Sequence, residues 1–234
     1  LREYLGSTYS LVNDLIELYE RFLGMIKKPL LKKGSQFQIP AILYSATWLR
    51  NEAEAGILTL MRGHITDSSN FSRRAIEISA FITLMNKDDS AAIRWMEAGN
   101  SNKARERYIS RFPAWQLVKE HLPEALKSHY EHRCLDVHPS FFAVVKRASL
   151  EENRVCFKYF DLAEKEEQIY FVMQFFLLHL IHGEIMDFLS CNVFAGEHLD
   201  VSEWKKYFLD FADKWNGLRE EWRSKIDKHF DDYD

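Results

Sequence analysis

Cysteine is scarce in this sequence, and its arrangement argues against a fold held together by disulfides or by structural zinc. The three cysteines, Cys134, Cys156 and Cys191, are odd in number, far apart and free of any Cys-x-x-Cys spacing. Disulfide frameworks and zinc sites both depend on paired or closely spaced cysteines. We therefore expect a reducing, cytoplasmic compartment and no bound metal.

Four motifs that carry nucleotide or hydrolytic chemistry are missing from the chain. It contains no Gly-x-x-x-x-Gly-Lys-Ser/Thr loop, no Gly-x-Gly-x-x-Gly, no His-Glu-x-x-His and no Gly-x-Ser-x-Gly. These patterns mark P-loop nucleotide hydrolases, dinucleotide-binding folds, zinc peptidases and serine hydrolases, respectively. None of these activities is expected, and no cofactor is predicted.

An excess of positive charge is also absent. The chain has 31 lysines and arginines against 35 aspartates and glutamates, which gives a formal net charge of −4. Any contact with a polyanion must therefore be local. Two basic groups could make such a contact, although both also suit ordinary solvated faces. They are Lys27, Lys28, Lys32 and Lys33 in one loop, and Lys103, Arg105, Arg107 and Arg111 around Tyr108.

The chain has no uninterrupted apolar run of membrane-spanning length. Its most apolar stretch, Ile169–Leu189, is broken by Gln174 and by four ionisable residues. A spanning helix needs roughly 18 apolar residues in a row, so we expect the central buried helix of a bundle and no membrane contact. The first twenty residues carry charged side chains where a secretory signal would be apolar, and no signal is predicted.

What the sequence does contain is helical periodicity at both ends. Apolar residues recur at spacings of three and four, which predicts helices over residues 5–27 and 200–230. The aromatic C-terminal stripe favours packing within the chain, with a second subunit as the alternative partner. The two stripes are Leu5, Tyr9, Val12, Ile16, Tyr19, Leu23 and Ile26, and Val201, Trp204, Phe208, Phe211, Trp215, Leu218 and Trp222.

The same periodicity continues between the two ends. A second helix carries the small residues Ala46, Ala53 and Gly56, which would let a neighbouring helix approach closely. A third helix is expected to open at Asp67 or Ser68, whose side chains can cap free amides. With 47% apolar residues in 234, the chain can bury one core. We predict a single all-α bundle with its central part at roughly residues 41–191.

Prolines punctuate the second half of the chain. Pro113 and Pro123 both suit first turns, so residues 114–137 can form two helices instead of one. Pro139 disfavours helical geometry at the preceding residue. His138 is therefore expected at a helix end.

One segment departs from the helical pattern. Phe141–Val145 and Val155–Phe160 are rich in β-favouring residues. They predict a short β-hairpin or flap around residues 141–160, with Lys146–Arg154 as its loop.

The sharpest polar cluster ends in Arg133 and His138. Five positions along a helix turn the direction by about 140°, so the two side chains could flank a groove. An imidazole can move a proton near neutral pH, and a guanidinium can hold a phosphate with two hydrogen bonds. Together they supply what metal-independent cleavage of RNA requires.

An arginine followed after four residues by a histidine, in a helical chain of this size, resembles the HEPN superfamily. These helical-bundle domains are often found in bacterial toxin–antitoxin and phage-defence systems. A second stretch, Phe71–Glu77, looks like the Arg-x-x-Glu helix of some divergent HEPN-like bacterial proteins, with Arg74 and Glu77 in the motif. The resemblance spans roughly Trp48–Leu189 in helix order.

The resemblance implies that Arg133 and His138 are the catalytic pair of a metal-independent endoribonuclease, with the site usually completed across a homodimer. Active members usually carry Asn, Asp or His directly after the arginine, whereas Cys134 stands here. Many relatives have lost catalysis and serve as binding or regulatory modules. Such a module would bind a protein partner such as an antitoxin.

Four further residues are candidates for a supporting polar cavity. His179 and His182 lie three apart in the most apolar helix, and we interpret them as hydrogen-bonded within the bundle because no third metal ligand is fixed. Arg74 and Glu77, also three apart, are most simply a helix salt bridge. The HEPN-like resemblance would instead let them face the same cavity.

Two hypotheses of different classes follow. In the first, the chain is an RNA-cleaving HEPN-like enzyme that uses Arg133 and His138. In the second, it is a non-catalytic helical interaction or regulatory module. In that case Arg133 pairs with Glu131 or Asp136, and His138 merely ends a helix.

Overall fold

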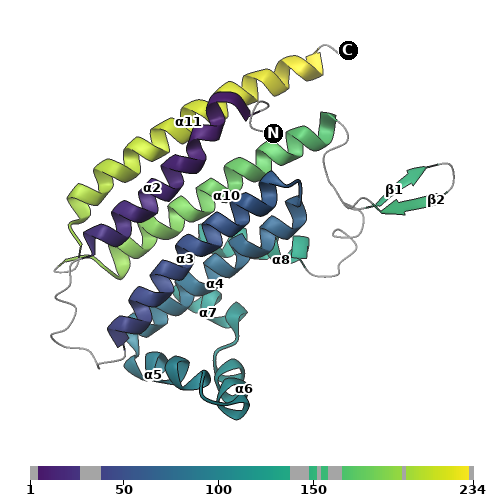
Figure 1. Cartoon of the computed structure of the whole chain (residues 1–234). Helices are drawn as coiled ribbons and strands as arrows, with labels where there is room; N and C mark the ends of the chain where they lie inside the picture. Colours follow the sequence, from purple (N-terminus) through teal and green to yellow (C-terminus); the bar gives the residue numbers. More distant parts are fainter. Residues whose placement is uncertain are drawn as a thin grey trace.

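The computed structural model describes residues 5–26, 38–137, 148–151, 154–157, 165–196 and 199–231, with side chains described at 5–26, 38–135, 169–196 and 199–224. Helices dominate this part of the chain, so the predicted all-α bundle is confirmed (Figure 1). The elements are the short 3-10 helix η1 (Gly6–Tyr9), α2 (Ser10–Met25), α3 (Gln38–Met61), α4 (Ile65–Lys87), α5 (Asp89–Ala98), α6 (Asn102–Arg111), α7 (Ala114–His121), α8 (Glu124–Val137), β1 (Ala148–Glu151), β2 (Arg154–Phe157), α10 (Lys165–Asn192) and α11 (Val201–Asp231).

Helix α10 is the centre of the bundle, as its apolar sequence predicted. It contacts α2, α3, α4, α8 and α11, and Phe171, Phe175 and Ile181 are fully buried. By length and composition, Ile169–Asn192 could also cross a membrane, but 67% of its most apolar stretch is buried inside the fold. Core helices of soluble proteins share this property.

Small residues allow α3, α4 and α10 to lie close together. A Cβ atom added at Gly56 would stand 3.0 Å from Leu178 Cδ1 and 3.3 Å from Phe71 Cβ. Ala46 and Ala53 on the same helix are fully buried. The predicted close approach of a neighbouring helix is therefore confirmed.

The C-terminal aromatic stripe packs within the chain, as predicted. The Trp215 indole donates to the Phe176 carbonyl of α10 at 3.0 Å. The Trp222 indole donates to the Thr8 hydroxyl at 2.7 Å. Helix α11 thus connects η1 with α10. Helices α2, α10 and α11 run side by side in Figure 1.

The apolar stripe predicted for the N-terminal helix lies slightly to one side of the face of α2 that is buried. The most buried residues of α2 include Leu11, Leu15 and Phe22, whereas Val12 and Ile16 of the predicted stripe are only partly buried. Helix α2 contacts α3, α10 and α11, so more than one stripe is covered. Periodicity alone cannot find the centre of such a wide face.

Two other boundaries also differ from the predictions. Helix α4 begins at Ile65, which is buried. The Ser68 hydroxyl donates to the Ile65 carbonyl and does not cap the helix. The hairpin pairs Ala148–Glu151 with Arg154–Phe157, so its first strand falls in the predicted loop. Residues 141–145, predicted as that strand, lie outside the described residues.

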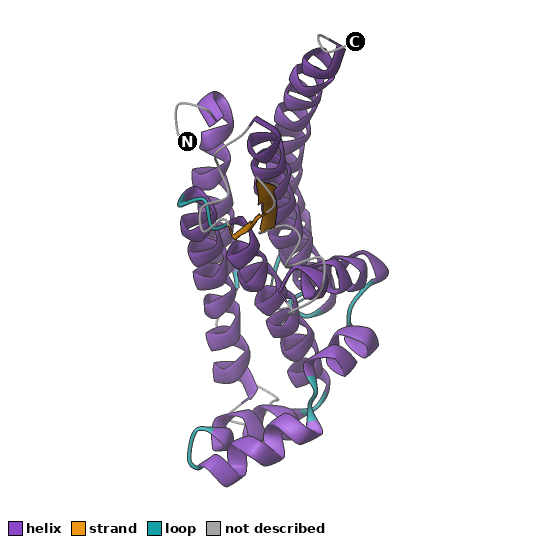
Figure 2. Ribbon diagram, turned by 90° about the vertical axis from the view of Figure 1, so that its right-hand side faces the viewer, coloured by secondary structure: helices purple, strands orange, loops and turns teal. Residues whose placement is uncertain are grey.

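Helices α5, α6 and α7, which we call the foot, lie toward one end of the bundle, away from the N- and C-terminal ends (Figures 1 and 2). Asp88 caps α5 by accepting from the Ser90 amide at 2.9 Å. Helix α6 contains no fully buried residue. Ring contacts from Tyr108 to Phe81 and Phe112, at 5.5 and 5.4 Å between centroids, attach it to the bundle.

Candidate functional site

Arg133 lies inside the bundle, where it joins three helices. Its side chain extends from α8 and is only 4% exposed. One nitrogen, Nη1, donates to the Ser69 hydroxyl of α4 at 2.7 Å and to Gln174 Oε1 of α10 at 2.6 Å. His138, its predicted partner, lies outside the described residues.

A second polar cluster connects α4 with α8. The Tyr130 hydroxyl donates to Glu77 Oε1 at 3.1 Å, and Arg73 Nε lies 3.5 Å from the same carboxylate. Burial raises the pKa of Glu77 and also that of the Cys134 thiol. Cys134, which directly follows Arg133 in the chain, therefore keeps its proton at neutral pH.

Arg74 pairs with a carboxylate that sequence reasoning missed. Its Nε and Nη2 donate to Glu52 Oε2 of α3 at 2.9 and 2.7 Å. Glu52 is only 3% exposed. The expected Arg74–Glu77 salt bridge is thus replaced by two pairs, Arg74 with Glu52 and Arg73 with Glu77. The signal for Glu52 was its position next to Ala53 on the inner stripe of α3.

His179 and His182 are fully buried and hydrogen-bonded within the bundle. His179 Nδ1 donates to the Phe175 carbonyl at 2.7 Å, and His182 Nδ1 lies 2.7 Å from the Tyr19 hydroxyl. Burial lowers the pKa of His179 to about 4. Burial, with His179 nearby, lowers that of His182 to about 3. Both imidazoles are therefore neutral near pH 7.

Arg74 and Glu77 share a cavity, but the two histidines do not line it. The cavity has a volume of about 340 Å³, and we call it the aromatic groove. Arg74 and Glu77 lie in it beside apolar side chains from five helices, α3 to α7. Those side chains include Trp48 of α3, Ile78 and Phe81 of α4, Trp95 of α5, Tyr108 and Ile109 of α6, Phe112 directly after α6, and Leu117 of α7.

A larger open cavity lies between α5 and α6. Its volume is about 630 Å³, and Arg94, Arg107 and Arg111 line it together with Glu97. We call it the arginine groove. Tyr108 lines both grooves, so they are neighbours on the same end of the molecule. The sequence indicated Arg107 and Arg111, while Arg94 joins them only through the packing of α5 on α6.

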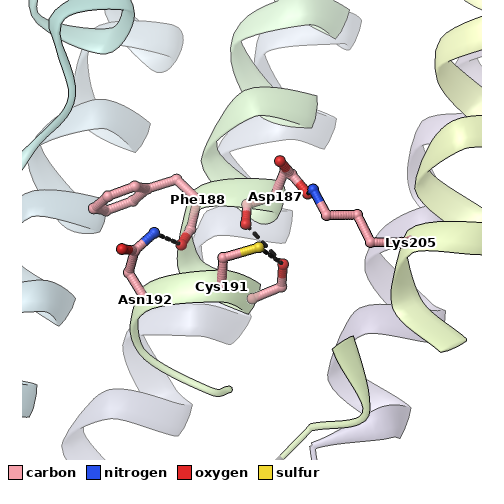
Figure 3. A network of polar contacts seen from close by, with 6 residues as sticks. Asp187, Phe188, Cys191, Asn192 and Lys205 are labelled. Atoms are coloured by element: carbon pink, nitrogen blue, oxygen red, sulfur yellow. Dashed lines mark hydrogen bonds and ion pairs between the residues drawn. The ribbon is translucent and has the colours of Figure 1, made fainter. Parts of the chain in front are cut away.

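A further polar cluster in the described residues links α10 and α11. Lys205 of α11 reaches Asp187 of α10 at 2.6 Å (Figure 3). Cys191 lies one turn further along α10 in the same network. No group of three or more His, Cys, Asp or Glu side chains gathers as a metal site in the part of the chain that the structure describes.

Comparison with known proteins gives no relative for this chain. No family model matches it, and neither the curated proteins nor the solved structures give a significant match. The function must therefore be argued from the geometry and chemistry of the residues themselves.

Proposed function

We propose that the protein is a non-catalytic helical interaction module, HEPN-like in its helix order, whose binding surface is the end formed by α5, α6 and α7. The position of Arg133 carries the proposal. A catalytic guanidinium must meet a phosphate at the site of reaction. The Arg133 side chain is nearly buried, and its guanidinium donates hydrogen bonds to acceptors on two other helices. These contacts suit a residue that stabilises the packing of three helices.

The exposed foot supplies the interaction part of the proposal. Helix α6 buries none of its residues completely, yet it holds apolar and cationic side chains beside two cavities. Exposed apolar surface of this kind marks interaction sites. A regulatory role in a toxin–antitoxin or phage-defence system belongs to the same proposal and rests on the HEPN-like motifs alone.

The test is a nuclease assay of the full chain in EDTA, combined with denaturation of Arg133→Ala and His138→Ala. We expect no RNA cleavage that depends on either residue. Arg133→Ala should lower the free energy of unfolding by about 1–3 kcal/mol, because Ser69 and Gln174 lose their charged donor in the core. Arg223→Ala on α11 is the control. Its side chain is 71% exposed, and its loss should change stability by no more than about 0.5 kcal/mol.

One outcome would support the ribonuclease hypothesis instead. If the parent cleaves RNA in EDTA and His138→Ala abolishes cleavage at an unchanged melting temperature, the chain is a metal-independent endoribonuclease. The non-catalytic proposal would then be wrong, whatever the effect of Arg133→Ala on stability.

A further inference from the structure

Large apolar side chains are exposed at the foot and on the adjacent part of α3, where no described part of the chain covers them. Trp48 of α3 is 41% exposed and Ile109 of α6 is 58% exposed. Trp115, at the start of α7, is also exposed. Trp48 and Ile109 line the aromatic groove, and Trp115 directly follows the lining residue Ala114 in the chain. Contact of water with such a surface is unfavourable, so binding of a partner that covers it lowers the free energy of the system.

The aromatic groove suits a few anchoring side chains better than a large ligand. Its volume of about 340 Å³ is at the lower end of the roughly 300–1,000 Å³ that is typical of ligand pockets. Its lining mixes aromatic rings with the aliphatic residues Ile78, Ile109 and Leu117. Apolar side chains that project from one face of a helix fill grooves of this kind.

The arginine groove adds unbalanced positive charge next to this apolar surface. Arg94, Arg107 and Arg111 form no ion pair with any residue that the structure describes. Within α6, Glu106 is the only carboxylate among four cations. Carboxylates of a partner would complement these guanidinium groups, because a guanidinium can donate two parallel hydrogen bonds to the oxygens of one carboxylate.

We propose that the two grooves together bind an acidic amphipathic helix of another protein. Apolar side chains on one face of that helix would enter the aromatic groove, and Asp or Glu residues along its edge would face Arg94, Arg107 and Arg111. This inference rests on the proposed function, because it names the partner of the interaction module.

The composition of the foot favours such a protein helix over RNA. Protein interfaces are enriched in Trp, Tyr, Phe and Arg and depleted in Lys, and the residues that line the two grooves include all four of the enriched types and no Lys. A single-stranded RNA site would combine a longer cationic track with aromatic faces for stacking. Here Glu97 lines the arginine groove, and the net charge of the chain is −4.

The test is selection of the full chain against a displayed library of helical peptides about 18 residues long, above the roughly 12–15 below which isolated helices are marginal. Apolar residues are fixed at positions i, i+4 and i+7, and the remaining positions vary among Glu, Lys, Gln and Ala. We expect the enriched peptides to be acidic. A single-stranded RNA is titrated in parallel as the probe for the other class of partner.

Variants of exposed residues then locate the site without disturbing the core. The double variant Arg107→Glu, Arg111→Glu and the single variant Ile109→Ser should each weaken the selected peptides at least about tenfold. Arg223→Glu and Leu209→Ser, both on exposed positions of α11, are the matched controls and should leave binding unchanged. Melting temperatures confirm that all variants are folded.

Three results would overturn the inference. In the first, no peptide is enriched, or the enriched peptides have no acidic bias. In the second, the groove variants bind as well as the controls. In the third, RNA binds more tightly than any peptide and loses affinity in Arg107→Glu, Arg111→Glu, which would assign the foot to nucleic acid. None of these results concerns cleavage, so they are distinct from a failure of the proposed function.

Discussion

His179 and His182 are ionisable groups held uncharged in the centre of the bundle. Both are fully buried, and each uses Nδ1 for a hydrogen bond, to the Phe175 carbonyl and with the Tyr19 hydroxyl. Burial also raises the pKa of Tyr19, so this hydroxyl keeps its proton. The cluster is therefore neutral in the folded protein and couples stability to pH.

Acid should unfold the protein through these histidines. Their pKa values of about 4 and about 3 in the folded state lie below the roughly 6.5 of an unfolded chain. Below about pH 6.5 the unfolded state binds more protons, so stability falls as the pH falls towards the folded values. Above about pH 6.5 the two histidines add no pH dependence. Each should contribute a slope of up to about 1.4 kcal/mol per pH unit.

Urea denaturation of the parent and of His182→Gln between about pH 7 and pH 5 measures this slope. The variant should be less stable near neutral pH but less sensitive to acid. His132→Gln on the exposed face of α8 is the control and should keep the parent's slope. An identical slope in the parent and His182→Gln would contradict the predicted coupling.

The contact of α3 with α4 and α10 depends on the missing side chain of Gly56. Leu178 Cδ1 and Phe71 Cβ would lie 3.0 and 3.3 Å from an added Cβ atom. Glycine is otherwise unfavourable within a helix, by about 0.8–1 kcal/mol relative to alanine. Its presence here is explained by close helix packing.

A pair of glycine substitutions separates these two effects. Gly56→Val should lower the free energy of unfolding by about 1–3 kcal/mol, because it overfills a packed interface. Gly217→Ala in α11 should raise it by about 0.8–1 kcal/mol, since no heavy atom lies within 4 Å of an added Cβ. Chemical denaturation measures both. A stabilising Gly56→Val would show that the three helices can move apart at little cost.

Stability is expected to be uneven over the whole molecule. Helix α10 is surrounded by five other helices, whereas α6 stands at the end of the foot without a fully buried residue. Local opening requires the least free energy where few apolar contacts are lost. The foot is therefore the part whose local opening we expect a bound partner to suppress most.

Hydrogen exchange of the free protein should follow this gradient. Amides of α10 and α4 should exchange most slowly, near the limit set by global unfolding, and amides of α6 should exchange fastest among the described helices. A selected acidic peptide should slow exchange in α5 and α6 but not in α11. Equal protection of α6 and α10 in the free protein would mean that the foot is already covered or more firmly packed than its burial indicates.

The sequence determined the helical class and the approximate positions of several helices, because helix-forming periodicity, capping residues and prolines act over a few neighbouring residues. The break at Pro123 and the inward-facing stripe of α11 were both predictable on this basis. So was the burial of His179 and His182, which lie inside the most apolar helix. The HEPN-like assignment stays a prediction from two short motifs.

Only the tertiary structure decided which side chains meet across helices. Arg133 could have faced solvent from α8. Instead its guanidinium donates to Ser69 and Gln174, which lie on other helices and more than forty positions away along the chain. Glu52 and Arg74 are separated by 22 positions, and Arg94 joins Arg107 only through the packing of α5 on α6. Local periodicity says which face of a helix is buried, whereas the partner of a polar side chain depends on how separate helices are packed.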